Sequence, residues 1–94
     1  MVKSVTSEED LVAQLSSAGG RLVVIDFWAQ WCGPCVAFAP TFDAIAADYA
    51  SRDEPVVFLK CEDKAADAHQ ARGIRALPTF QFYLKGVKVD EVSY

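Results

Sequence analysis

Short apolar runs alternate along these 94 residues with stretches in which apolar residues recur at helical spacing. The run Leu22–Trp28 is nearly continuous and rich in β-branched residues, as is typical of a central strand covered on both faces. Shorter runs predict four further strands, at 2–5, 55–61, 79–84 and 87–92, with a turn at Lys85-Gly86 between the last two. Strands that alternate with helices predict an α/β fold.

Three stretches have the spacing of helices. The first begins at Thr6, whose hydroxyl forms a capping box with Glu9, and ends at Gly19-Gly20, where glycine adopts the left-handed conformation at low cost. The second runs from Cys35 to about residue 50 and contains Pro40, which should kink it. The third covers 63–72. Two sets of residues are expected to face the core: Leu11, Val12 and Leu15 on the first helix, and Phe80, Phe82 and Leu84 on a strand.

Composition and charge restrict the class of protein. A chain of this length forms one domain, and 52% hydrophobic residues suffice for a core without covalent cross-links. The net charge of −4 and the lack of a Lys/Arg cluster argue against a nucleic-acid or membrane-surface partner. The first residues lack an apolar signal core, and no apolar run approaches the roughly 20 residues that span a bilayer. We therefore expect a cytoplasmic, reducing environment.

The strongest chemical motif is Trp31-Cys32-Gly33-Pro34-Cys35, directly after the central strand. Two thiols separated by two residues can close and reopen a small disulfide ring. Cys32 precedes the first turn of a helix, where unpaired N–H groups and the helix dipole stabilise a thiolate. This predicts Cys32 as the nucleophile and Cys35 as the resolving thiol, with Gly33 and Pro34 forming a stiff bend.

A competing interpretation of this motif is a metal site, which would need further ligands from the remaining cysteine and histidine. A CxxC pair is half of many zinc sites, but only Cys61 and His69 remain to complete a tetrahedron. We therefore expect no metal and no cofactor other than the Cys32–Cys35 disulfide. Cys61 is interpreted as a buried free thiol, with a regulatory oxidation site as the alternative, and His69 as a solvated surface residue.

Asp26 is the one charged residue inside the central apolar run. One interpretation is an edge-strand aspartate that faces solvent. The other is a buried acid with a raised pKa, able to exchange a proton with Cys35. The sequence pattern leaves both open. The acidic group Glu8-Glu9-Asp10 is interpreted as solvated and favourably placed at a helix start.

The chain resembles the thioredoxin family in four segments: Val24–Ala29, Trp31–Cys35, Pro40 and Gly73–Phe80. The resemblance implies a thioredoxin fold, with a central mixed β-sheet flanked by helices. It implies a cis Leu77-Pro78 bond beside the cysteines, and a substrate-binding surface made by Trp31, Ala76, Leu77 and Pro78. It also favours the buried acid at Asp26, with Lys60 as a nearby modulator.

The function implied by this resemblance is that of a protein-disulfide reductase. Its substrates would be protein disulfides, and a thioredoxin reductase-type donor would return it to the dithiol form. One alternative is an N-terminal thioredoxin-like interaction module of a larger protein with little redox turnover. Another is a disulfide isomerase or oxidant, whose active-site dipeptide usually contains histidine rather than Gly33-Pro34.

Three departures from the family pattern stand out. Val36 replaces a common lysine, which removes a positive charge and should raise the Cys32 pKa or alter partner choice. Tyr94 stands where many members have glycine beside the substrate groove. The family's C-terminal helix has no counterpart within residues 1–94, so we expect a single domain truncated at its C-terminal end, or one whose open face is covered by a domain swap or a downstream domain.

Overall fold

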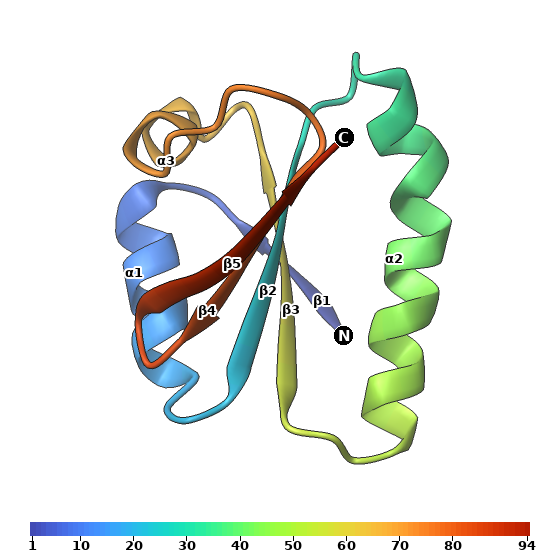
Figure 1. Cartoon of the computed structure of the whole chain (residues 1–94), viewed down its shortest axis with the longest axis vertical. Helices are drawn as coiled ribbons and strands as arrows, with labels where there is room; N and C mark the ends of the chain where they lie inside the picture. Colours follow the sequence, from blue (N-terminus) through green and yellow to red (C-terminus); the bar gives the residue numbers. More distant parts are fainter.

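The computed structural model describes all 94 residues and contains one mixed sheet and three helices (Figure 1). The strands are β1 (Val2–Val5), β2 (Leu22–Trp28), β3 (Val56–Glu62), β4 (Thr79–Leu84) and β5 (Val87–Ser93). The helices are α1 (Glu8–Ser17), α2 (Gly33–Ser51) and α3 (Ala66–Ala71). The strand order is β1-β3-β2-β4-β5, in which β1, β3 and β2 are parallel and β4 and β5 are antiparallel to their neighbours. The predicted α/β class is confirmed. No helix is long and apolar enough to cross a bilayer.

The sheet is covered differently on its two faces (Figure 1). Helix α2 lies along one face, and α1 and α3 lie on the other. Because successive side chains of a strand point to opposite faces, β2 contributes side chains to the packing on both faces of the sheet. Ile25 and Phe27 are buried with Leu11 of α1, whereas Val24 packs with Phe42 of α2.

The topology brings three chain segments to one edge of the sheet. The parallel strands β2 and β3 both end there, and antiparallel β4 begins there. The backbone N–H of Asp63, after β3, donates to the carbonyl of Trp28 at the end of β2, at 3.0 Å. Loops that leave β2 and enter β4 therefore lie close together although they are about 50 residues apart in sequence.

Helix α1 begins one residue later than predicted. Its N-cap is Ser7, whose hydroxyl accepts the N–H of Asp10 at 3.0 Å, rather than Thr6 paired with Glu9. The N–H of Thr6 instead donates to the Asp10 carboxylate at 2.9 Å, so the capping pair is shifted by one position. Of the predicted apolar face only two residues are buried, because the side chain of Val12 is 53% exposed.

Helices α2 and α3 also differ from their predicted bounds. Helix α2 starts at Gly33, two residues early, and continues through Pro40. Pro34 fits its first turn because the N–H that proline lacks would have no helical partner there. Helix α3 has only six residues, since the chain forms a turn after Glu62 before the helix begins.

The prediction that one face of β4 packs in the core is confirmed for Phe80 and Phe82, which are half-buried against the cluster of Val24 and Phe42, and is wrong for Leu84, which is 40% exposed. The opposite face of β4 is the more fully buried one. That buried face carries Thr79, Gln81 and Tyr83. The physical reason is that the aromatic face borders the part of the sheet that α2 leaves open, whereas the other face packs beneath α1 and α3.

Candidate active site

The two cysteines of the WCGPC motif form a disulfide at the start of α2. Their Cα atoms are 5.3 Å apart, and both residues are buried. They form a small cluster with Ala29, against which Trp28 and Leu77 pack. The predicted redox pair is therefore assembled, with Cys35 slightly more buried than Cys32.

Cys32 is the N-cap residue of α2. Its sulfur accepts the backbone N–H of Cys35 at 3.2 Å, and its carbonyl accepts the N–H of Val36 at 3.1 Å. An N-cap side chain of this kind satisfies one of the free N–H groups at the end of the helix. In the reduced protein the same N–H and the helix dipole would favour negative charge on this sulfur.

The loop that precedes β4 also lies beside the disulfide. Its Leu77–Pro78 bond is cis, in agreement with the expectation from the family resemblance, and Leu77 packs against the cysteines. A groove beside Cys32 is lined by this loop and by the motif itself. Its lining includes Trp31, Asp63, His69, Ile74, Arg75 and Ala76.

Trp31 forms the exposed wall of this groove. Its side chain is 74% exposed, and its Nε1–H donates to the Asp63 carboxylate at 2.8 Å. This hydrogen bond fixes the indole although most of its surface meets solvent. Sequence reasoning did not identify Asp63, but its place directly after β3, at the edge where β2 also ends, would have been the clue.

Asp26 is buried, with 5% of its surface exposed. Alternation along β2 places it on the same face as Val24, which α2 covers, and its Oδ1 has no hydrogen-bond partner. Burial raises the pKa of Asp26 to about 6, and the charge of Asp43 on α2 adds to this, while Lys60 opposes it. The edge-strand interpretation is therefore wrong, because β2 is the central strand of the sheet.

Lys60 lies opposite Asp26 in the register of β2 and β3. Its ammonium group is 5.5 Å from the centre of the Trp28 ring, and its charge lowers the pKa of Asp26. The indole N–H of Trp28 is buried without a hydrogen-bond partner. The structure thus places Lys60 near the acid, as expected.

The third cysteine and the histidine lie on the other face of the sheet. Cys61 is a fully buried free thiol, and burial raises its pKa to about 12. The interpretation of His69 as a solvated residue is wrong. Its Nε2 lies 2.9 Å from the carbonyl oxygen of Cys61, its ring contacts Phe27 edge-on at 5.3 Å, and it lines the groove described above. No group of three or more His, Cys, Asp or Glu side chains is arranged to hold a metal ion.

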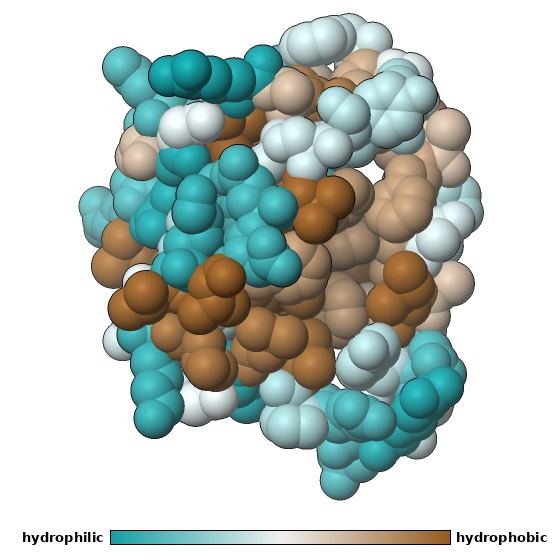
Figure 2. Space-filling model, in the orientation of Figure 1, coloured by the Kyte–Doolittle hydropathy of each residue, from teal (hydrophilic) through white to brown (hydrophobic).

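The α2 face of the sheet contains a separate, entirely apolar groove of about 410 Å³. It extends between α2 and the strands, and hydrophobic residues are visible at the surface in this part of the molecule (Figure 2). Its walls include Phe42 and Ile45 of α2, Phe58 of β3, Phe82 of β4 and Val92 of β5. None of its lining residues is polar.

A disulfide at a helix N-terminus, a cis-proline loop against it and a buried acid on the central strand define a thiol–disulfide oxidoreductase. The family comparisons agree with this class. The thioredoxin family profile matches residues 2–93, and the chain belongs to the thioredoxin family.

Curated relatives match over almost the whole chain. Thioredoxin of Equus caballus is 43% identical over 98 residues, which cover 99% of this chain and 86% of the horse protein. Thioredoxin of Mus musculus is 44% identical with the same coverage. Identity at this level over almost the whole chain supports the reductase activity of this protein as well as its fold.

Solved structures agree as closely. Fasciola hepatica thioredoxin superposes with a TM-score of 0.90 at 35% identity, covering 97% of this chain and 85% of that protein. A chain from the complex of ferredoxin:thioredoxin reductase with thioredoxin f2 superposes with a TM-score of 0.89 at 29% identity, covering 99% of this chain and 82% of that one. The thioredoxin fold is therefore shown.

Proposed function

We propose that this protein-disulfide reductase works by a two-thiol exchange in which Cys32 attacks and Cys35 resolves. The observation that carries the proposal is the position of Cys32 at the N-cap of α2, with its sulfur against the N–H of Cys35. In the dithiol form, the Cys32 thiolate attacks one sulfur of a substrate disulfide. A mixed disulfide forms, and the other substrate sulfur leaves as a thiolate and takes up a proton.

The second half of the cycle uses the buried acid. Asp26, as a carboxylate, accepts the proton of the Cys35 thiol, and the resulting Cys35 thiolate attacks the Cys32 sulfur. The mixed disulfide breaks, the substrate leaves with two reduced sulfurs, and the Cys32–Cys35 disulfide remains. The pKa of about 6 suits this role because the carboxylate dominates at neutral pH and still binds a proton readily. Lys60 tunes that pKa from the neighbouring strand.

The substrate-binding surface is proposed to consist of Trp31 and the loop of Ala76, Leu77 and Pro78. The exposed indole offers an apolar contact, Leu77 packs against the cysteines, and Ala76 is an exposed residue of the same loop. An extended strand of a partner protein can pair with free backbone groups of a loop of this kind. Gly33 and Pro34 complete the surface beside Cys32, where their exposed positions leave the attacking sulfur approachable.

The roles of the two cysteines are tested by trapping. Cys35→Ser should accumulate mixed disulfides with reducible substrates such as insulin, while Cys32→Ser should not. Cys61→Ser is the matched control, since this buried thiol takes no part in the cycle and the variant should turn over normally with dithiothreitol as electron source. Trapping by both active-site variants, or by neither, would contradict the assigned roles.

We propose a thioredoxin reductase-type protein as electron donor and the cytoplasm as the place of action. The donor is supported by the likeness to a chain from the solved complex of ferredoxin:thioredoxin reductase with thioredoxin f2. The compartment is supported by the odd number of cysteines and the buried free thiol, which suit reducing surroundings. Reduction of the isolated disulfide by a purified reductase with its electron source tests the donor, and no reduction would exclude that class.

We further propose that the apolar groove on the α2 face is covered by a helix downstream of residue 94. The support is the groove's wholly apolar lining and the 86% of the curated relatives' length that the chain matches. With the groove open, the 94-residue chain should be monomeric and should bind the dye ANS. A dimer that binds little dye would instead show a swapped element or a second copy in the groove.

A further inference from the structure

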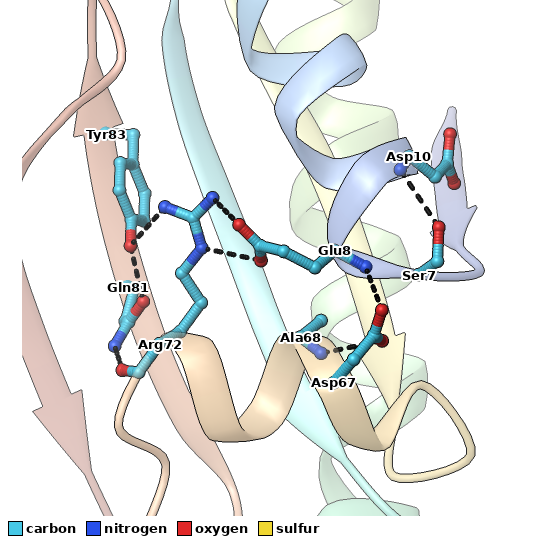
Figure 3. Close-up of polar contacts among 8 residues, drawn as sticks. All are labelled: Ser7, Glu8, Asp10, Asp67, Ala68, Arg72, Gln81 and Tyr83. Carbon is cyan, nitrogen blue, oxygen red and sulfur yellow. Dashed lines mark hydrogen bonds and ion pairs between the residues drawn. The ribbon is translucent and has the colours of Figure 1, made fainter.

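Arg72 lies at the point where α3 ends and the substrate loop begins (Figure 3). Its guanidinium makes a two-pronged contact with the Glu8 carboxylate, with Nε 3.0 Å and Nη2 2.7 Å from the two oxygens. Both side chains are largely buried, at 16% and 28% exposure. The N–H of Glu8 also donates to the Asp67 carboxylate at 3.1 Å, so the start of α1 is tied to both ends of α3.

The same arginine is held from the side of the sheet (Figure 3). Its Nη1 lies 3.4 Å from the Tyr83 hydroxyl, and its guanidinium carbon lies 5.3 Å from the centre of the Tyr83 ring. The Tyr83 hydroxyl donates to Oε1 of Gln81 at 2.8 Å, and Nε2 of Gln81 donates to the Arg72 carbonyl at 2.9 Å. The contacts among Arg72, Tyr83 and Gln81 form a closed ring, and Glu8 holds the guanidinium from outside it, so both the side chain and the backbone of Arg72 are fixed. We call these three residues, together with Glu8, the Arg72 ring.

The ring places polar groups where an apolar core would suffice. Gln81 is fully buried and Tyr83 nearly so, on the face of β4 that packs beneath α1 and α3. A buried amide costs free energy unless its donors and acceptor are paired, and here each is satisfied. Gln81 Nε2 even has a second acceptor, Glu91 of β5, at 2.7 Å. Fully paired buried polar groups of this kind fix one geometry.

The loop that follows has its far end anchored and its near end dependent on Arg72. At the far end, the Thr79 hydroxyl donates to the Ala76 carbonyl, and the N–H of Tyr94 donates to the Pro78 carbonyl at 3.1 Å. At the near end, Gly73 turns the chain with φ +68° and Ile74 donates only back into α3, to His69 at 3.0 Å. The start and middle of α3 are held by Asp67 and His69, and its end, from which this part of the loop leaves, is held by the side-chain contacts of Arg72.

We propose that the Arg72 ring is a positioning device that fixes the near end of the Gly73–Pro78 loop and thereby sets the affinity for protein disulfide substrates. The proposal rests on the substrate surface proposed above. The loop carries Ile74, Arg75 and Ala76 into the groove beside Cys32, so a shift of its near end moves groove-lining residues. None of the ring residues lines that groove or belongs to the cysteine cluster. Loss of the ring should therefore weaken binding and leave the chemical steps intact.

Two pairs of variants with matched controls test the ring. Arg72→Met removes every donor but keeps the stem, and its control is Arg52→Met, which removes an exposed arginine paired with Asp48 at the end of α2. Glu8→Ala removes the link between Arg72 and α1, and its control is the adjacent Glu9→Ala, which removes an equal charge from an exposed position on the same turn. Because Glu8 is partly exposed, its variant should fold even where Arg72→Met does not.

The first readout is steady-state reduction of insulin at temperatures well below each variant's melting temperature. We expect KM to rise about fivefold in Glu8→Ala and Arg72→Met, with kcat within twofold of the parent and both controls unchanged. The double variant should raise KM no further than Arg72→Met alone, because both act through one contact. A fall in kcat with KM unchanged, or no change in folded variants, would overturn the proposal.

The second readout does not depend on turnover. Amide hydrogen exchange at Gly73 and Ile74 should be at least tenfold faster in Glu8→Ala than in Glu9→Ala, while exchange at Asp63, which lies after β3, should be the same in both. Equal exchange at Gly73 and Ile74 would overturn the ring as a positioning device. If the parent protein reduced no insulin, the proposed function would fail, and the exchange experiment would still decide whether the ring holds the loop.

Discussion

Replacement of Asp26 by asparagine should stabilise the oxidised protein at neutral pH and have little effect in acid. The Asp26 side chain is buried on the face of β2 that α2 covers, and its Oδ1 has no hydrogen-bond partner. Its pKa is raised from 3.8 to about 6, chiefly by burial. Asparagine has the same shape and never carries the charge.

The magnitude and sign follow from that shift. Between about pH 4 and pH 6 the folded protein holds a proton on Asp26 that the unfolded chain has lost, so the free energy of unfolding falls as the pH rises. A shift of about two pH units corresponds to about 3 kcal/mol. This loss in the free energy of unfolding is absent below pH 4 and complete above pH 6. Asp26→Asn should therefore gain about 3 kcal/mol over the parent between these limits.

Urea denaturation of both oxidised proteins at half-unit steps from pH 4 to pH 8 measures this gain directly. Any fixed cost of burying the amide changes the free energy of unfolding of Asp26→Asn equally at every pH. The test is therefore how the difference between variant and parent changes with pH. The control is Asp53→Asn, an exposed position with φ +56° that asparagine adopts readily. A difference between Asp26→Asn and the parent that stays constant across this range would refute the raised pKa.

Two further experiments test the N-cap of α1 and the burial of Cys61. Ser7→Ala removes the side chain that caps α1, which should lower the free energy of unfolding by about 1 kcal/mol in urea, whereas Thr6→Ala should cost less. Because Cys61 is fully buried and its pKa is raised to about 12, iodoacetamide at pH 8 should not label it in the folded oxidised protein. Rapid native labelling, detected by mass spectrometry, would contradict the burial of this thiol.

The central strand and the redox motif were predictable because local patterns determine them. Leu22–Trp28 is apolar on both sides, and its predicted bounds agree with β2. The start of α2 was predicted two residues late because the sequence pattern does not show that Cys32 itself caps the helix. The error at α1 concerns which of two neighbouring side chains, Thr6 or Ser7, accepts a backbone N–H, and the sequence pattern does not decide between them.

The residues that were misjudged depend on contacts between distant segments. The apolar alternation along β4 placed Phe80 and Phe82 correctly against the core on the α2 side, but it did not show that the opposite face, with Gln81, is the more fully buried one. A buried glutamine is stable there only because Arg72 and Glu91 supply its partners. Glu8 was likewise misjudged as solvated, because its partner Arg72 lies 64 residues away in the sequence. No local pattern shows such pairs.

The burial that makes Asp26 costly for folding also raises its pKa, and this raised pKa underlies the role proposed for it at the cysteines. A carboxylate on the central strand destabilises the folded protein at neutral pH, and the proton transfer to and from Cys35 proposed above would account for its presence. Asp26→Asn should therefore reduce insulin more slowly than the parent at pH 7, and the deficit should shrink towards pH 9, where hydroxide removes the Cys35 proton without help. The measurement is the pH–rate profile of both proteins, with Asp53→Asn as control. Parallel profiles would show that Asp26 does not carry the proton, even if its stability cost proves real.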